Sequence, residues 1–182
     1  YIIRTGGDFL WETYVERTGE LVLFREFYDK CKEKFSKKEK IIFNLGGKAL
    51  RKASFVVYST EWQKNIFEKV YNLDKTKSRI IENYCGPREE QIEPDNRSFI
   101  AGTRDLKWKN IDALKKAFKI AQEKVIEKGF ENIEFDTTKA VYENFQERMR
   151  RSYAVILVSL GDASPSLIFD AIRVGVPFIV TK

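Results

Sequence analysis

The strongest constraint on the fold is a continuous apolar run, Ala154 to Ser159 (AVILVS), in the second half of the chain. A run of this kind is typical of a strand buried on both faces of a parallel sheet. Expected elements alternate around it: strands at 98–103, 133–135 and 177–181, and helices at 110–128, 139–151 and 165–174. Because parallel strands need crossover connections, this order predicts a parallel sheet covered by helices on both faces.

The first half of the chain also follows an α/β pattern. Strands are expected at 1–5, 54–59 and 79–83, a helix at 61–72, and a loop at Gly6, Gly7 and Asp8. Apolar residues from Phe24 to Phe35 recur at helical spacing and predict a helix of about four turns. A further segment, expected to break at Gly46 and Gly47, leads to the strand at 54–59.

A charged stretch with two prolines, residues 86–97, separates the two halves. Proline and clustered polar residues are typical of linkers. The sequence therefore predicts one domain at 1–85 and a second at 98–182.

The composition, 43% hydrophobic and 33% charged, is that of a globular protein without an apolar run long enough to cross a bilayer. We expect a cytoplasmic protein. The chain has no histidine, which excludes imidazole-based zinc sites and Ser-His or Cys-His catalysis. Cys31 and Cys85 form no disulfide framework or metal site, and Cys31 is expected to be a buried thiol.

Basic residues concentrate in two places. Residues 30–40 carry six lysines, and Arg148, Arg150 and Arg151 form a second group. The lysines fit a solvated helix face, attraction to an anionic membrane surface, or attraction to nucleic acid. No RNA- or DNA-reading motif accompanies them, so we expect no nucleic acid partner.

The first candidate site follows the expected strand at 98–103. Arg104 and Lys109 lie on one loop just ahead of a helix. Two positive charges near a helix N-terminus suit a diphosphate, because the exposed N–H groups add to the attraction. A polar loop with solvated basic residues is the alternative.

The second candidate site follows the apolar run. Ser164 suits an N-cap and Pro165 the first helical position, so a helix is expected to begin at the end of the strand. Asp162 precedes this helix, and Asp170 lies about one and a half turns into it. Taken alone, Asp162 fits a helix-dipole partner and Asp170 an ion pair with Arg173.

Together the two places resemble the C-terminal domain of GT-B glycosyltransferases, particularly the retaining family 4. That family has a G-R-x₄-K-[GN] loop after its first strand. The corresponding residues here, with one residue inserted after the glycine, are Gly102, Thr103, Arg104, Lys109 and Asn110.

The family also has an E-x₇-E motif ending in E-A, followed by G-x-P-[VF]-[IV]-x-T. Asp162 and Asp170 keep that spacing with aspartates in place of glutamates. The likeness continues through Ala171, Gly175, Pro177, Phe178, Ile179 and Thr181. The segments KASFVVYSTEWQKNIFEKVYN and IIENYCGP look like the end of the family's first domain.

The resemblance implies an α/β fold of the GT-B type, with two Rossmann-like domains that are both incomplete in this chain. It implies a retaining, metal-independent enzyme that moves a sugar from a nucleotide-sugar donor to a sugar, lipid-linked or protein acceptor. No other cofactor is implied. Peripheral contact with an anionic membrane is compatible with this activity.

The resemblance also assigns roles to residues. Arg104 and Lys109 would hold the donor pyrophosphate, and Asp170 would accept hydrogen bonds from the ribose hydroxyls. Asp162 would lie beside the donor sugar, and N–H groups around Ser164 and Ser166 would face sugar or phosphate.

One departure leaves alternatives open. Many family members place a histidine of the first domain near the donor sugar, where this chain offers only Asp8 or Glu12. A GT-B-like binding or scaffold protein without turnover is therefore the second hypothesis. A GT-B epimerase or phosphorylase is the third, and a phosphorylase would not depend on a nucleotide.

Overall fold

The computed structural model describes residues 1–181 except 91, 95, 103, 105 and 137–141. The described residues form two compact units, each built around a parallel sheet. The first unit comprises Tyr1–Asn83 and Leu160–Ser164, and the second comprises Tyr84–Ser159 and Pro165–Lys182. The predicted α/β class with parallel strands is confirmed. The stretch 86–97, expected as a linker, falls within the second unit.

The sheet of the second unit has the strand order β5-β4-β6-β7, and all neighbouring strands are parallel. Its strands are β4 (Ser98–Ala101), β5 (Glu134–Asp136), β6 (Ala154–Leu157) and β7 (Phe178–Val180). Every residue of β6 is buried, as the apolar run predicts.

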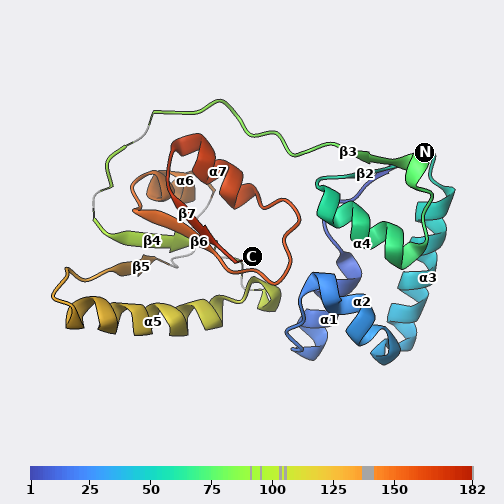
Figure 1. Cartoon of the computed structure of the whole chain (residues 1–182), viewed down its shortest axis with the longest axis horizontal. Helices are drawn as coiled ribbons and strands as arrows, with labels where there is room; N and C mark the ends of the chain where they lie inside the picture. The colour runs from blue at the N-terminus through green and yellow to red at the C-terminus, as the bar shows by residue number, and fades with distance from the viewer. Residues whose placement is uncertain (91, 95, 103, 105, 137–141, 182) are drawn as a thin grey trace. The chain divides into compact units, whose positions relative to one another are not determined.

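Helices cover both faces of this sheet (Figure 1). They are α5 (Ile111–Glu127), α6 (Tyr142–Arg150) and α7 (Ser166–Val174), and a short 3-10 turn, η3 (Lys107–Lys109), precedes α5. On one face α5 packs Leu114 and Phe118 against Ile156. On the other, α6 and α7 pack Met149 and Val174 against the sheet.

The predicted elements of the second half agree with these bounds to within a few residues. Two predicted positions, Thr103 at the end of a strand and Lys139 at the start of a helix, lie outside the described residues. Among the described residues, no helix has both the length and the apolar composition that a membrane span needs.

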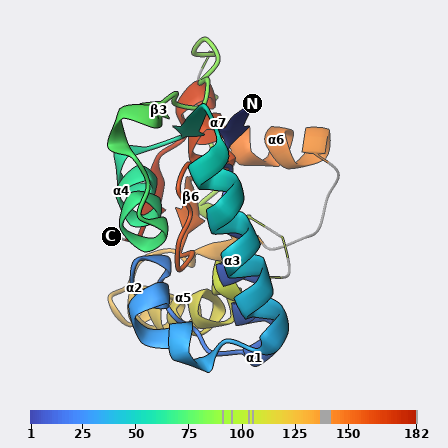
Figure 2. The ribbon, with the colours of Figure 1, turned by 90° about the vertical axis from the view of Figure 1, so that its right-hand side faces the viewer.

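The sheet of the first unit has the strand order β1-β2-β3 and is also parallel. Its strands are β1 (Ile2–Arg4), β2 (Phe55–Tyr58) and β3 (Ser78–Ile80). Its helices are α1 (Phe9–Thr18), α2 (Phe24–Cys31), α3 (Lys37–Lys52) and α4 (Glu61–Tyr71), with 3-10 turns η1 (Lys32–Lys34) and η2 (Lys75–Lys77). In Figure 2, α3 runs down the centre of the view, with α4 beside it.

Aromatic side chains fill the core of the first unit. The ring of Tyr28 lies 4.8 Å from that of Phe27, 5.8 Å from that of Phe43 and 5.9 Å from that of Tyr71, between centroids. Edge and tilted ring pairs of this kind add to the stability that burial supplies. Cys31 is fully buried among these residues, as predicted, and burial raises the pKa of its thiol.

Helix α1 was not predicted, because Gly6 and Gly7 indicated a loop. Asp8 caps the helix, since its Oδ1 accepts a hydrogen bond from the Trp11 N–H at 2.9 Å. Gly19 ends it with a φ of 73°. A capping residue, apolar residues at helical spacing and a terminal glycine were all readable in the sequence.

Two other predictions for the first half are wrong. The helix that begins at Phe24 ends at Cys31, where the chain passes into η1, and a new helix starts at Lys37. A reciprocal pair of hydrogen bonds fixes the start of that helix, α3. The Ser36 N–H donates to the Glu39 carboxylate at 2.7 Å, and the Glu39 N–H donates to Ser36 Oγ at 3.3 Å.

Helix α3 also continues unbroken through Gly46 and Gly47. The two glycines have different surroundings. A Cβ added to Gly46 would meet nothing within 4 Å, whereas one added to Gly47 would lie 2.9 Å from Cδ1 of Tyr71. Close packing against a ring thus explains Gly47, and nothing in the structure explains Gly46.

We predict that Gly46→Ala raises the free energy of unfolding by about 0.5–1 kcal/mol, because alanine loses less backbone entropy in a helix. Gly47→Ala should lower it by about 1 kcal/mol or more, because the Tyr71 ring is held by its neighbours. Urea unfolding followed by tryptophan fluorescence measures both, since Trp11 and Trp62 lie in the first unit. An equal gain in the two variants would contradict the packing explanation.

Candidate functional site

The strand order of the second unit reverses direction at β4. The chain passes from β4 to β5 on one side of it, and then returns to β6 on the other side before continuing to β7. In open α/β sheets, ligands bind beyond the carboxyl ends of the two strands at such a reversal. The candidate site of this unit is therefore the edge where β4 and β6 end.

The connections that leave this edge lie against each other. Ala101, the last residue of β4, pairs with Ile156 of β6. A Cβ added to the next residue, Gly102, would lie 3.4 Å from Cδ2 of Leu167 in the first turn of α7. The loop after β4 and the start of α7 are thus neighbours.

The loop after β4 carries the two predicted phosphate ligands. The side chain of Arg104 is exposed. Lys109 is half-buried, with its Nζ 4.2 Å from the ring centroid of Trp108, which is only 6% exposed. A cation held over an indole ring is attracted to its face. The buried Trp108 therefore helps to fix where the Lys109 ammonium lies.

Asn110 joins this loop to α5. It has a φ of 57°, a left-handed conformation that asparagine tolerates better than most residues. The turn lets α5 begin at Ile111. The N-terminus of α5, which carries partial positive charge, therefore adjoins the loop of Arg104 and Lys109.

Helix α7 begins one residue later than the sequence suggested. Ser166 is its first residue and Pro165 its cap, so the prediction of Ser164 as N-cap is wrong. The carbonyl of Pro165 accepts a hydrogen bond from the Ile168 N–H at 3.1 Å. Ser164 belongs to the first unit, where its Oγ accepts a hydrogen bond from Asn83 Nδ2 at 2.9 Å.

Asp170 lies one turn after Ser166 on α7. Its Oδ1 is 3.5 Å from Arg173 Nη2, which is the ion pair expected from the sequence. Gln146 of α6 also donates to Oδ1, at 3.4 Å. The carboxylate is thus held on α7 by a cation and an amide, with 18% of its side chain exposed.

Residues 85–89, at the start of the stretch that the sequence marked as a linker, support α7. Cys85 Sγ donates to the Phe169 carbonyl at 3.5 Å, and the Glu89 N–H donates to the Arg173 carbonyl at 2.7 Å. The Glu89 carboxylate forms ion pairs with Arg150 and Arg173. These contacts position the helix that carries Asp170, and no motif in the sequence indicated them.

The predicted site residues are thus divided between the two units. Arg104, Lys109, Ser166 and Asp170 belong to the second unit, and the first two adjoin the start of α7 through Gly102. Asp8, Asp162 and Ser164 belong to the first unit. The roles expected for all of them remain predictions.

Asp8, predicted as a catalytic residue, has both carboxylate oxygens engaged. Oδ1 caps α1, and Oδ2 accepts a hydrogen bond from Tyr28 Oη at 2.6 Å. Tyr28 Oη is also 2.9 Å from Tyr71 Oη. Burial raises the pKa of Asp8, and the hydrogen bonds from Tyr28 and Trp11 lower it by less. This geometry fits a buried helix cap.

The raised pKa of Asp8 predicts a pH dependence of stability. The folded chain binds the Asp8 proton more tightly than the unfolded chain, whose Asp8 titrates near 3.8. The protonated form of Asp8 therefore stabilises the folded chain fully below pH 3.8. This stabilisation is lost as the pH rises through the pKa of Asp8 in the folded chain. Asp8→Asn cannot titrate, and its amide can still accept from Trp11 and donate to Tyr28.

We expect the stability of the wild type, relative to Asp8→Asn, to fall as the pH rises above about 3.8. Urea unfolding at several pH values measures this difference. Asp74→Asn is the matched control, because hydrogen bonds from Thr76 lower the pKa of the exposed Asp74. The stability of the wild type relative to Asp74→Asn should therefore rise, and not fall, as the pH increases. A difference for Asp8→Asn that is independent of pH would contradict the assignment.

Comparison with known proteins adds no identification. No protein-family model matches the chain, and no curated protein matches it either.

Proposed function

We propose that the chain is part of a GT-B glycosyltransferase that takes a nucleotide sugar as its donor. The observation that carries the proposal is the reversal of strand order at β4, where the loop of Arg104 and Lys109 adjoins the start of α7. Two basic side chains and two helix N-termini at one sheet edge suit a diphosphate. The resemblance of the same two segments to family 4 motifs supports a sugar donor.

In this proposal the donor diphosphate lies at the edge where β4 ends. Arg104 and Lys109 bind its oxygens, and the partial positive charge at the N-termini of α5 and α7 adds to the attraction. Asp170 accepts hydrogen bonds from the ribose hydroxyls. Ser166 is exposed in the first turn of α7, where its hydroxyl and N–H can donate to the donor.

The transfer breaks the bond between the anomeric carbon and the phosphate oxygen, and the acceptor oxygen forms the new bond and releases its proton. Negative charge develops on the departing diphosphate. Arg104 and Lys109 stabilise that charge without a metal ion, as fixed cations do in other sites of phosphate chemistry. Retention of configuration is part of the proposal through the family resemblance alone.

A GT-B-like binding protein without turnover is the second candidate. One observation favours it: Asp8, the acid proposed in place of the missing histidine, serves as a buried helix cap. Such a protein would bind the nucleotide through the second unit and would not consume the donor.

Calorimetric titration with UDP, GDP and ADP tests the donor site. We expect one nucleotide to bind, and Arg104→Ala and Asp170→Ala each to weaken that binding about tenfold or more, because each removes hydrogen bonds to or from a charged group. Asp170→Glu should retain most of the affinity. Binding of none of the three nucleotides would contradict the donor site.

Arg97→Ala is the matched control for Arg104→Ala. Arg97 immediately precedes β4, whereas Arg104 follows it, and Arg97 pairs with Glu131 at 3.8 Å. Removing Arg97 changes the net charge equally but at the opposite end of the strand, so binding should be unchanged. Hydrolysis of the matching nucleotide sugar separates an enzyme from a protein that only binds.

A further inference from the structure

The outward face of α3 carries two large aliphatic side chains. Ile41 is 58% exposed and Leu45 is 61% exposed, and they lie one helical turn apart. The opposite face of the helix packs into the first unit, with Gly47 and Leu50 buried and Phe43 stacked on Tyr71 at 4.9 Å. Ile41 and Leu45 therefore take no part in the core of the unit.

Lysines surround this aliphatic pair. Lys37, Lys48 and Lys52 share the helical stripe of Ile41 and Leu45, because the five residues are spaced by three or four positions. All three lysines are exposed. Lys38 is exposed beside them. The face thus combines four ammonium groups with a central aliphatic pair.

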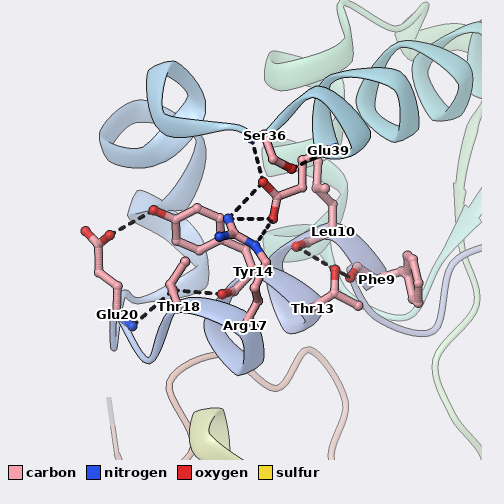
Figure 3. A network of polar contacts seen from close by, with 9 residues as sticks. All are labelled: Phe9, Leu10, Thr13, Tyr14, Arg17, Thr18, Glu20, Ser36 and Glu39. Atoms are coloured by element: carbon pink, nitrogen blue, oxygen red, sulfur yellow. Dashed lines mark hydrogen bonds and ion pairs between the residues drawn. The ribbon is translucent and has the colours of Figure 1, made fainter.

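The one acidic residue of α3 is turned away from this face. Glu39 is only 5% exposed, and its carboxylate accepts hydrogen bonds from Arg17 Nε at 3.0 Å and Nη2 at 2.9 Å (Figure 3). The Ser36 N–H also donates to it. The outward face of α3 is therefore basic without a carboxylate of its own helix.

The lysines that precede α3 are different. Lys30 pairs with Glu26 and Lys34 with Glu20, each at 2.7 Å. The lysine run at 30–40 is therefore partly neutralised before α3 begins. The exposed basic surface therefore extends along α3, from Lys37 to Lys52.

We propose that the outward face of α3 binds to an anionic lipid bilayer. The four lysines meet headgroup phosphates and carboxylates, and Ile41 and Leu45 enter the boundary between headgroups and acyl chains. Interfacial helices bind through this combination of buried apolar area and attraction to anionic lipid. The inference does not depend on the proposed glycosyltransferase activity.

Lipid fits this face better than nucleic acid does. A nucleic acid would form ion pairs with the lysines, but its charged phosphate backbone would lie against the aliphatic pair. Proteins that bind single strands stack bases on aromatic side chains. The exposed residues of α3 include no aromatic side chain.

Sedimentation with lipid vesicles tests the proposal. We expect the chain to bind vesicles of phosphatidylcholine mixed with phosphatidylserine, to ignore phosphatidylcholine alone, and to bind less as salt is raised. Lys48→Glu with Lys52→Glu should weaken binding roughly 30-fold or more, from about fivefold for each lysine removed. Ile41→Ser with Leu45→Ser should weaken it about tenfold at unchanged charge.

Matched controls lie on α5 of the second unit. Lys116→Glu with Lys119→Glu makes the same change in net charge, and Ile120→Ser with Ile126→Ser removes two aliphatic side chains that are 53% and 57% exposed. Neither pair should change vesicle binding. Equal losses from the α3 and α5 variants would overturn the proposal in favour of a net-charge effect.

A direct probe of insertion is Ile41→Trp, whose fluorescence should shift to the blue with anionic vesicles as the indole leaves water. Absence of vesicle binding by the wild type would overturn the proposal. Binding to a DNA duplex that the α3 lysine variant abolishes, without binding to vesicles, would assign the face to nucleic acid instead. Thermal unfolding of every variant checks that the fold is intact.

Discussion

The pairing of β4 with a parallel strand on each side is the constraint on which the second unit depends. Parallel neighbours cannot be joined by a hairpin, so each connection must cross a face of the sheet as a helix. The chain leaves β4 through α5 on one face and uses α6 and α7 on the other. Two of these helices, α5 and α7, begin at the edge where β4 and β6 end. The positions of Arg104 and Ser166 thus follow from the sheet.

In the first unit, the positions of the helices depend on two buried carboxylates at helix N-termini. Asp8 caps α1 and also accepts a hydrogen bond from Tyr28 of α2. Glu39 closes the cap of α3 and also binds Arg17 of α1. Each carboxylate therefore fixes the start of one helix and its contact with a second. The inward turn of Glu39 also sets which side of α3 faces outward.

The sequence predicted those parts of the fold that depend on local pattern. The buried strand β6 and the amphipathic helix α5 were predictable because burial on a regular element gives a regular pattern. The continuity of α3 was not predictable, since packing of Gly47 on Tyr71 overrides the low helix propensity of glycine. The helix cap of Asp8 was readable in its local sequence, but its second hydrogen-bond partner was not. Its hydrogen bond to Tyr28 spans twenty residues, and composition cannot indicate such a partner.

A run of like charges in a sequence does not define a charged surface, because the helix period and local ion pairs redistribute it. Lys34 belongs to the run but pairs with Glu20, whereas Lys52 lies outside the run and shares the face of Ile41. One exposed aliphatic side chain on a soluble protein needs no explanation. Ile41 and Leu45 differ from a single exposed residue because they lie on adjacent turns and share their helix face with exposed lysines. In the proposed membrane-bound state, a bilayer interface buries them, because it is both apolar and anionic.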